Sequence, residues 1–283
     1  MTGDLHCHSR CSDGSLGVEE LVQCARRAGL DLLALTDHDT MLGVERAQQA
    51  GERYGVRVIG GVELSCWDSQ RGRKVHLLCY LPQRPQLLKA AMERTLADRN
   101  RAMEQSLALV AGRYPISREL VNRFSQGSAC LYNVHIMRAL MELGYADRPY
   151  GTLFRQLLAP GGSCYVSHAY GEVWETARLI QKAGGVCVLA HPSVYDSIGL
   201  MEELAQAGLL DGVERFFPRL REQDIPAIDR VLSEYGLIPT GGTDFHGSNT
   251  NHPHPLGTCV TTQDSLERFF HRAKIKQKEA QEF

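Results

Sequence analysis

The chain has 283 residues, 43% of them hydrophobic and 23% charged, which suits a globular protein with one barrel-sized domain or two smaller ones. Its formal net charge of −2 argues against a general electrostatic grip on nucleic acid and leaves room only for a local basic patch. Nine cysteines without a C-x-x-C pair fit a reducing compartment, and no segment resembles a signal peptide or a membrane span. We therefore expect a cytoplasmic protein.

The beginning of the chain carries a candidate metal-binding motif. His6 and His8 are one residue apart, so on an extended strand both side chains lie on the same face and can bind one metal ion. Asp13 follows in a turn rich in serine and glycine, which allows its carboxylate to fold back toward the same space. An H-x-H pair alone is a weak signal, so the prediction depends on the rest of the chain.

Apolar runs and helical periodicity predict an alternation of strands and helices. The expected strands cover about 30–35, 56–63, 75–80, 186–190, 212–217 and 237–240. The expected helices cover about 18–28, 43–54, 173–183, 200–207 and 225–235, with a closing helix after Ser265. A long polar helix (87–111) and several shorter ones interrupt this pattern. We therefore expect a helical insert (85–158) within a barrel domain (1–84 and 159–283).

Metal-binding side chains follow the ends of several expected strands. In a barrel of parallel strands, the loops after the C-terminal ends converge on one mouth, where functional residues lie. The residues at or just past such ends are His6, His8, His38, Glu63, His191, Asp244 and His246. His76 stands near the start of its strand and must reach the same mouth in another way, if it does. One histidine at a strand end is often a cap or a core residue, but this many together indicate one site.

The types of side chain narrow the chemistry of this site. Imidazoles and carboxylates without a neighbouring thiolate suit Mn, Fe or Zn in a catalytic site better than a structural zinc. A carboxylate such as Glu63 can bridge two ions, and a pair of ions can share a hydroxide and polarise a phosphoryl group. The sequence therefore predicts a catalytic metal centre.

The chain resembles the PHP (polymerase and histidinol phosphatase) superfamily in an ordered set of motifs. These motifs are Asp4-Leu5-His6-Cys7-His8, Thr36-Asp37-His38, Gly61-Val62-Glu63, His76, Leu189-Ala190-His191-Pro192 and Gly242-Thr243-Asp244-Phe245-His246. The likeness is greatest to small bacterial 3′,5′-nucleotide bisphosphate phosphatases, whose close relatives trim short RNA from its 5′ end. It runs from residue 4 to about residue 257. It implies an α/β fold, a distorted (β/α)7 barrel with a helical subdomain inserted after the strand that carries His76.

The same resemblance implies three divalent metal ions, with manganese expected first and iron or zinc as alternatives. The first ion would be held by His6, His8, Glu63 and Asp244, the second by Glu63, His76 and His191, and the third by Asp13, His38 and His246. A hydroxide bridging the first two ions would attack phosphorus, which makes Glu63, Asp244 and His191 the expected catalytic residues. Asp4 and Asp37 either orient ligand imidazoles or serve as turn residues.

The insert is expected to cover the barrel mouth and to select the substrate. Asn133-Val134-His135 resembles the insert motif of the family, except that Asn133 and Val134 stand where an arginine and a proline are usual. We expect His135 to bind a second phosphate of the substrate. Asn133, Arg101 and Arg118 are weaker candidates for substrate binding, because arginines on an exposed helix are usually only solvated.

These features favour a metal-dependent phosphatase that removes the 3′-phosphate of nucleoside 3′,5′-bisphosphates, such as adenosine 3′,5′-bisphosphate, and leaves the 5′-mononucleotide. A 5′-to-3′ exoribonuclease on short RNA would use the same metals on a diester, but needs an open basic groove. A histidinol-phosphate phosphatase is disfavoured by an insert suited to a larger substrate. A degenerate PHP module that only binds is disfavoured by nine complete ligand positions. We expect a nucleotide, or at most short RNA, as the binding partner, with no membrane association and no stable protein partner.

Overall fold

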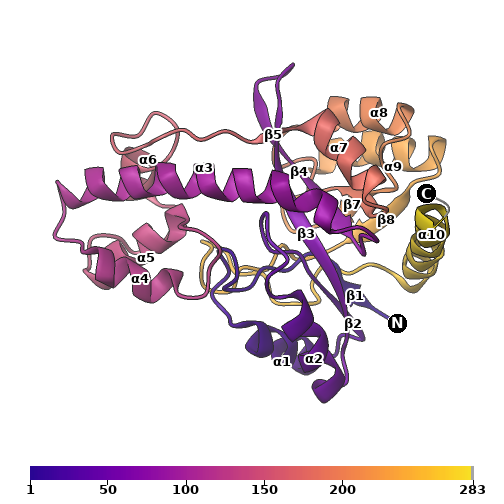
Figure 1. Cartoon of the computed structure of the whole chain (residues 1–283), viewed down its shortest axis with the longest axis horizontal. Helices are drawn as coiled ribbons and strands as arrows, with labels where there is room; N and C mark the ends of the chain where they lie inside the picture. Colours follow the sequence, from indigo (N-terminus) through magenta and orange to yellow (C-terminus); the bar gives the residue numbers. More distant parts are fainter. Residues whose placement is uncertain (282–283) are drawn as a thin grey trace.

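The computed structural model describes residues 1–281. Figure 1 shows a sheet curved into a barrel with helices around it, and beside it a separate group of helices beneath the long helix α3 (Gln86–Ala111). The barrel thus forms one part of the molecule, and the helices that interrupt the strand pattern form the other. Within the described residues, no helix combines the length and the apolar character that crossing a membrane requires.

The sheet is nearly closed. Its strands are β1 (Gly3–Asp4), β2 (Leu32–Leu35), β3 (Arg57–Asp68), β4 (Arg73–Tyr80), β6 (Val186–Leu189), β7 (Gly212–Phe216) and β8 (Ile238–Gly241), in the order β1-β2-β3-β4-β6-β7-β8, and the short β5 (Gly171–Glu172) pairs with β3. The two edges meet where the Leu5 amide donates to the Gly241 carbonyl at 3.1 Å and Cys7 pairs with Phe245. This confirms the expected α/β fold, a distorted (β/α)7 barrel.

Amphipathic helices cover the barrel. They are α1 (Val18–Arg27), α2 (Val44–Tyr54), α7 (Val173–Lys182), α8 (Ile198–Gln206), the short 3₁₀ turn η1 (Glu222–Asp224), α9 (Ile225–Glu234) and α10 (Gln263–Gln281). In α1 the buried residues Val18, Leu21, Val22 and Ala25 recur at the spacing of one helical face. The helices expected from periodicity are confirmed. Wherever a helix end was predicted, the observed end lies within two residues of it.

Strand β3 differs from the prediction in length. We expected it to end at Glu63, but it continues to Asp68, so Glu63 lies in the middle of a 12-residue strand. Its first half pairs in parallel with β2, and the half from Gly61 onward pairs antiparallel with β4. Hydrogen bonding to β4 allows the strand to continue beyond the barrel mouth, which apolar periodicity alone did not show.

Strand β4 explains the position of His76. It pairs antiparallel with both β3 and β6, whereas the neighbouring pairs β1–β2, β2–β3, β6–β7 and β7–β8 are parallel. In an antiparallel strand the first residues lie at the edge of the sheet where the parallel strands end. His76 therefore reaches the barrel mouth because it stands early in its strand.

The insert contains α3, α4 (Arg118–Ser125), α5 (Asn133–Glu142) and α6 (Thr152–Leu157). These helices bury an apolar cluster of their own, which includes Met103, Leu107, Ile136 and Leu140 and extends to Cys164 in the segment that returns to the barrel. Such a core is what an independently packed unit requires. The boundaries 85–158 for the insert, and 1–84 with 159–283 for the barrel domain, stay predictions.

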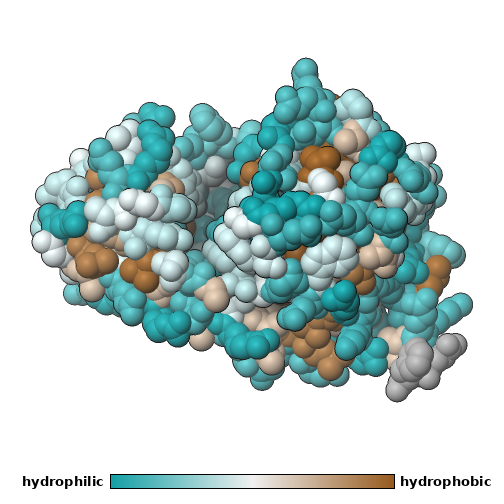
Figure 2. Space-filling view, turned by 90° about the horizontal axis from the view of Figure 1, so that it is seen from above, coloured by the Kyte–Doolittle hydropathy of each residue, from teal (hydrophilic) through white to brown (hydrophobic). Residues whose placement is uncertain are grey.

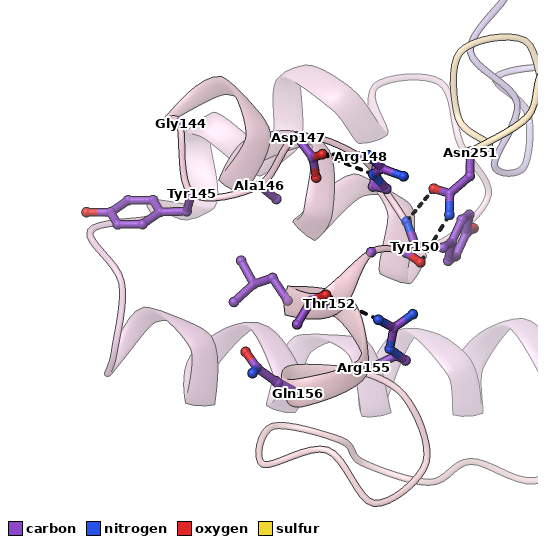
Figure 3. Close-up of a pocket in the computed structure, with 12 residues that line it drawn as sticks. Gly144, Tyr145, Ala146, Asp147, Arg148, Tyr150, Thr152, Arg155, Gln156 and Asn251 are labelled. Atoms are coloured by element: carbon purple, nitrogen blue, oxygen red, sulfur yellow. Dashed lines mark hydrogen bonds and ion pairs between the residues drawn. The ribbon is translucent and has the colours of Figure 1, made fainter.

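The insert is fastened to the loops at the barrel mouth. The Tyr132 hydroxyl donates to the His38 carbonyl at 3.1 Å, and the Ala129 amide donates to the Cys11 carbonyl at 2.9 Å. Farther out, Tyr150 and Asn251 exchange two hydrogen bonds (2.9 and 3.1 Å) beside an open cavity of about 810 Å³ formed by residues 144–156 (Figure 3). The insert is thus positioned by the same loops that carry the histidines.

The packing of α10 against the barrel can be tested with Phe269→Ala. Phe269 is fully buried and meets Tyr80 edge to face, with 5.3 Å between ring centroids. Because truncation removes apolar burial and leaves a cavity, the free energy of unfolding should fall by about 3–5 kcal/mol in denaturant titrations. His271→Ala, at an exposed position of the same helix, should change it by less than about 0.5 kcal/mol. A loss below about 1 kcal/mol for Phe269→Ala would contradict this packing.

Candidate metal centre

The nine predicted ligands come together at the barrel mouth. His6 and His8 follow β1, Asp13 lies in the next turn, and His38 follows β2. The others lie in β3, in β4, or in the loops after β6 and β8; they are Glu63, His76, His191, Asp244 and His246. Their ligand atoms form three groups, each with its atoms within 4.8 Å of one another, that together contain eight of the nine residues. His191 joins them through a direct contact with Glu63.

Glu63 lies at the centre of the arrangement. It is fully buried, and both of its carboxylate oxygens face imidazoles. Oε1 lies 2.7 Å from His76 Nδ1 and 2.9 Å from His191 Nε2. Oε2 lies 3.1 Å from a ring nitrogen of each of His6, His8 and His38. Each oxygen thus has its own set of imidazoles, which is the arrangement that a carboxylate bridging two ions requires.

Asp244 completes the group around the Oε2 atom. Its Oδ1 lies 3.6 Å from His6 Nε2 and 3.4 Å from His8 Nε2, while Arg219 donates to its Oδ2 at 2.6 Å. The residue has a φ of 49°, a conformation that is rare and costly for a residue with a side chain. The loop after β8 therefore holds Asp244 in a strained backbone conformation, and the strain places its carboxylate opposite the two histidines.

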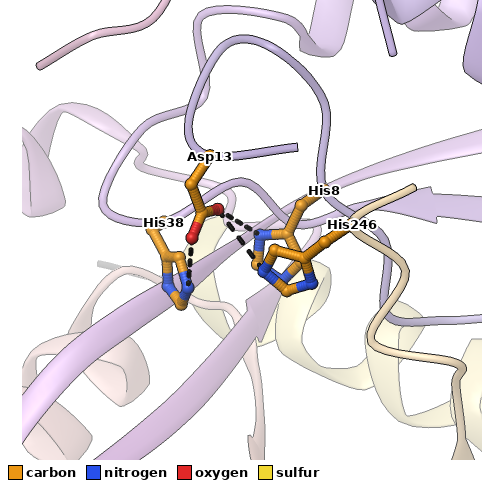
Figure 4. A group of neighbouring side chains, drawn as sticks. All are labelled: His8, Asp13, His38 and His246. Carbon is orange, nitrogen blue, oxygen red and sulfur yellow. Dashed lines mark ion pairs between the residues drawn. The ribbon is translucent and has the colours of Figure 1, made fainter. Parts of the chain in front are cut away.

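A third group surrounds Asp13 (Figure 4). Asp13 Oδ1 lies 3.4 Å from His246 Nε2 and 3.8 Å from His8 Nδ1, and Oδ2 lies 3.8 Å from His38 Nε2. His8 therefore contacts two groups, Asp13 through Nδ1 and Glu63 through Nε2. The prediction assigned His8 to the first ion alone, and in the structure its ring lies between the two groups.

The electrostatics favour a cation at this position. Burial alone would raise the pKa of the Glu63 carboxyl, but the neighbouring imidazoles, His6 and His76 among them, hold it well below its usual range. Burial acts in the opposite direction on His8, yet the neighbouring carboxylates of Asp244 and Glu63 raise its pKa to about 10. The carboxylates thus stabilise positive charge in a space from which water is largely excluded.

Several buried nitrogen and oxygen atoms of these residues have no hydrogen-bond partner among residues 1–281. They are His6 Nε2, both ring nitrogens of His8, His38 Nδ1, Glu63 Oε2 and His191 Nδ1. Buried polar atoms are almost always hydrogen-bonded, so a set of them in one place calls for a ligand. Imidazole nitrogens with carboxylate oxygens are the donors that Mn, Fe and Zn accept, and the residues fit divalent metal ions.

A second layer of carboxylates supports the ligands, and one of its members was missed. Glu214 in β7 accepts a hydrogen bond from His6 Nδ1 at 3.0 Å and from the His191 amide at 2.8 Å. Asp4 and Asp37, which were expected either to orient imidazoles or to serve as turn residues, contact loop groups instead. Asp4 accepts from Thr243 and Gly257, and Asp37 from Ser9 and Ser12. A buried glutamate inside a strand was the available signal for Glu214.

None of the four insert residues predicted to bind substrate belongs to the three groups of metal-binding atoms. His135 is buried at the start of α5, where its Nδ1 accepts from the Tyr132 amide at 3.2 Å, and burial lowers its pKa to about 4. Asn133 also lies at the start of this helix, and its Oδ1 has no hydrogen-bond partner among the described residues. Arg101 and Arg118 are exposed and pair with Asp98 and Glu104, so the structure does not bring them to the histidines.

Replacing Glu63 tests the bridging arrangement. Glu63→Ala removes the only carboxylate in contact with both imidazole sets among the described residues, so bound metal should fall by two ions per chain. Metal content by plasma mass spectrometry measures this. Glu52→Ala, at an exposed position of α2, serves as the control and should keep the wild-type content. Full metal content in Glu63→Ala would contradict the bridging role.

Glu214 gives a second, milder test. Glu214→Gln keeps the shape of the side chain but loses the charge that orients His6, so the affinity for metal should fall about 10–100-fold. Competition with a fluorescent chelator measures the affinity. If Glu214→Gln binds metal as tightly as the Glu52→Ala control, Glu214 has no part in holding the ligand.

Comparisons with known proteins agree with this geometry. The PHP domain family model matches residues 4–183. A phosphoribosyl 1,2-cyclic phosphate 1,2-diphosphodiesterase from Eggerthella lenta is 38% identical over 90% of this chain and 97% of its own length. A 3′,5′-nucleoside bisphosphate phosphatase from Chromobacterium violaceum is 35% identical, with 86% of each chain covered. A 5′-3′ exoribonuclease from Haemophilus influenzae is 29% identical over 86% of this chain and 89% of its own length.

A solved structure extends the likeness to the whole fold. It is a protein from Bifidobacterium adolescentis assigned as a metal-dependent phosphoesterase, with a TM-score of 0.87, 26% sequence identity, and 95% of this chain and 96% of that chain covered. The match therefore includes the insert as well as the barrel. Because the PHP domain family model matches well over half of its length, the chain belongs to this family and is a metal-dependent phosphoesterase.

Proposed function

We propose that this phosphoesterase removes the 3′-phosphate from nucleoside 3′,5′-bisphosphates and leaves the 5′-mononucleotide. The observation that carries the proposal is the Glu63 carboxylate, which faces His76 and His191 through one oxygen and three further imidazoles through the other. Such a buried carboxylate suits two adjacent cations, and paired cations suit the charge of a phosphoryl group.

The residues would divide among three divalent ions. The first would be held by His6, His8, Glu63 and Asp244, the second by Glu63, His76 and His191, and the third by Asp13, His38 and His246. Bound there, the ions would supply a nucleophilic water at neutral pH and neutralise charge on the phosphoryl oxygens. Manganese is our first expectation, because imidazole and carboxylate ligands without thiolate suit it.

The protein itself contributes positioning and charge. Glu214 fixes the ring of His6 through Nδ1, so its Nε2 stays turned toward Glu63. Arg219, half exposed beside Asp244, is placed to approach the oxygens of a phosphate at the mouth. The insert is hydrogen-bonded to the loops of the mouth through Tyr132 and Ala129, so we expect it to border a bound substrate and to restrict which substrates fit.

The choice of a bisphosphate is supported by the Chromobacterium violaceum relative, which is 35% identical over 86% of this chain. A second candidate is favoured by a different observation. The Eggerthella lenta relative shares 38% identity and is covered over 97% of its length, and its name describes a diesterase for a phosphoribosyl cyclic phosphate. Both names describe a ribose with a phosphoester on its ring. The same metal centre is suited to hydrolysing either ester.

A substrate panel tests the proposal. Hydrolysis with Mn²⁺ would be followed by chromatographic separation of the products from adenosine 3′,5′-bisphosphate, 5′-AMP, 3′-AMP, phosphoribosyl 1,2-cyclic phosphate and a 5′-phosphorylated RNA trimer. Products are separated because cleavage of a diester, unlike that of a monoester, releases no inorganic phosphate. We expect kcat/KM to be highest for the bisphosphate, by at least about tenfold over 5′-AMP, with 5′-AMP as the product. Preference for the cyclic phosphate would replace the monoester with a diester as the substrate, and preference for the trimer would make the protein an exoribonuclease.

A further inference from the structure

A group of basic and aromatic side chains lies beside the metal centre and takes no part in it. Lys74 comes from β4, Arg99 from α3, and His168 with Tyr170 from the return segment (158–170) between insert and barrel. Lys74 Nζ lies 4.8 Å from the centroid of the Tyr170 ring, and the His168 and Tyr170 rings are 4.7 Å apart. We call these four residues the basic cluster.

The basic cluster borders the metal centre on two sides. Lys74 and His76 stand two residues apart in β4, so their side chains share a face of the strand. On the other side, the ring of Tyr132 lies between the Arg99 guanidinium, 4.9 Å from its centroid, and the His38 ring at 6.2 Å. A ligand that reaches His76 would therefore also lie near Lys74, whereas Tyr132 separates Arg99 from His38.

The two cations of the basic cluster differ in whether the protein balances their charge. Arg99 donates to Asp39 Oδ2 at 2.7 Å and to Ser65 Oγ at 2.8 Å. Lys74, by contrast, has no carboxylate within 4.0 Å among residues 1–281, although it is only partly exposed. Burial of a cation without a counter-charge is costly, and a bound anion would remove that cost.

His168 gives an independent sign of a missing partner. Both of its ring nitrogens are buried, and neither has a hydrogen-bond partner in the described part of the chain. Burial, together with the charges of Arg99 and Lys74, lowers its pKa to about 3, so the ring is neutral and offers one N–H donor. An acceptor with negative charge satisfies both His168 and Lys74 at once.

The return segment leaves room for such a ligand. Figure 2 shows a hollow between the insert and the barrel on the face seen from above, and in Figure 1 the return segment crosses this side. In the cavity between residues 144 and 156, Arg148 and Asp147 pair with each other at 2.8 Å and Arg155 donates to Thr152. The basic cluster is therefore the better candidate for an anion.

We propose that Lys74 and His168 bind the phosphate of the substrate that does not react, the 5-phosphate of a ribose whose ring ester lies at the metal centre. A lysine ammonium and a neutral imidazole N–H are both suited to phosphate oxygens. The inference rests on the proposed function and deepens it, because it makes the protein specific for ribose 5-phosphates with a second ester. It also moves the second phosphate from His135, where the sequence placed it.

Two substitutions test the kinetic consequence. Lys74→Gln and His168→Gln would be compared with wild type, all as the full metal-loaded chain, on adenosine 3′,5′-bisphosphate and 3′-AMP, which differ only in the 5′-phosphate. We expect kcat/KM for the bisphosphate to fall about 10–100-fold, mostly through KM, and that for 3′-AMP to fall less than about threefold. Lys89→Gln, an exposed position of α3, should match wild type on both.

Binding of ribose 5-phosphate decides the inference without relying on hydrolysis. Isothermal titration should show affinity weakened about tenfold or more in Lys74→Gln and His168→Gln, and unchanged in Lys89→Gln. This result would support the site even if wild type hydrolyses no ester of the panel, which would overturn only the proposed function. Unchanged affinity in both variants, in proteins with wild-type thermal unfolding, overturns the inference. A selective loss in His135→Gln instead would place the phosphate at the start of α5.

Discussion

The contact of one carboxylate with five imidazoles governs the organisation of this protein. Glu63 is fully buried in the barrel, where a charged group is tolerated only if opposite charge surrounds it. The imidazoles that provide this surrounding come from the segments after β1, β2 and β6 and from β4 itself. Because these segments are distant in the sequence, the centre exists only when the sheet has curved until its edges meet.

The direction of one strand makes that geometry complete. With β4 antiparallel to its neighbours, His76 enters the mouth from the start of a strand while His38 and His191 enter from the ends of theirs. His76 thereby joins His191 at Oε1 of Glu63, while three other imidazoles face Oε2. The strained backbone at His191 (φ 26°) and Asp244 (φ 49°) is stabilised by the surrounding structure and serves the same placement.

The insert is fastened to the loops that carry the metal-binding side chains. Its contacts with the mouth are made by backbone and tyrosine groups of the segment around Ala129 and Tyr132, close to the metal ligands. Relatives of similar length bear names that describe a cyclic diesterase, a bisphosphate phosphatase and an exoribonuclease. The three names share the hydrolysis of a phosphoester and differ in the remainder of the substrate, so membership of the family does not by itself fix the substrate.

The sequence by itself determined the barrel class and the family and predicted the nine residues that gather at the barrel mouth, because strand periodicity and the ordered motifs are local properties. Glu214 was not found, since its role depends on the register between β7 and its neighbours, which only pairing decides. Likewise, Arg99 lies in a helix that the sequence predicted to be polar, yet the packing of α3 buries its side chain against Asp39. The grouping of ligands and the placing of the insert are long-range outcomes. Only the tertiary structure decided them, because they depend on which strands pair, in which direction, and on the loops that the insert touches.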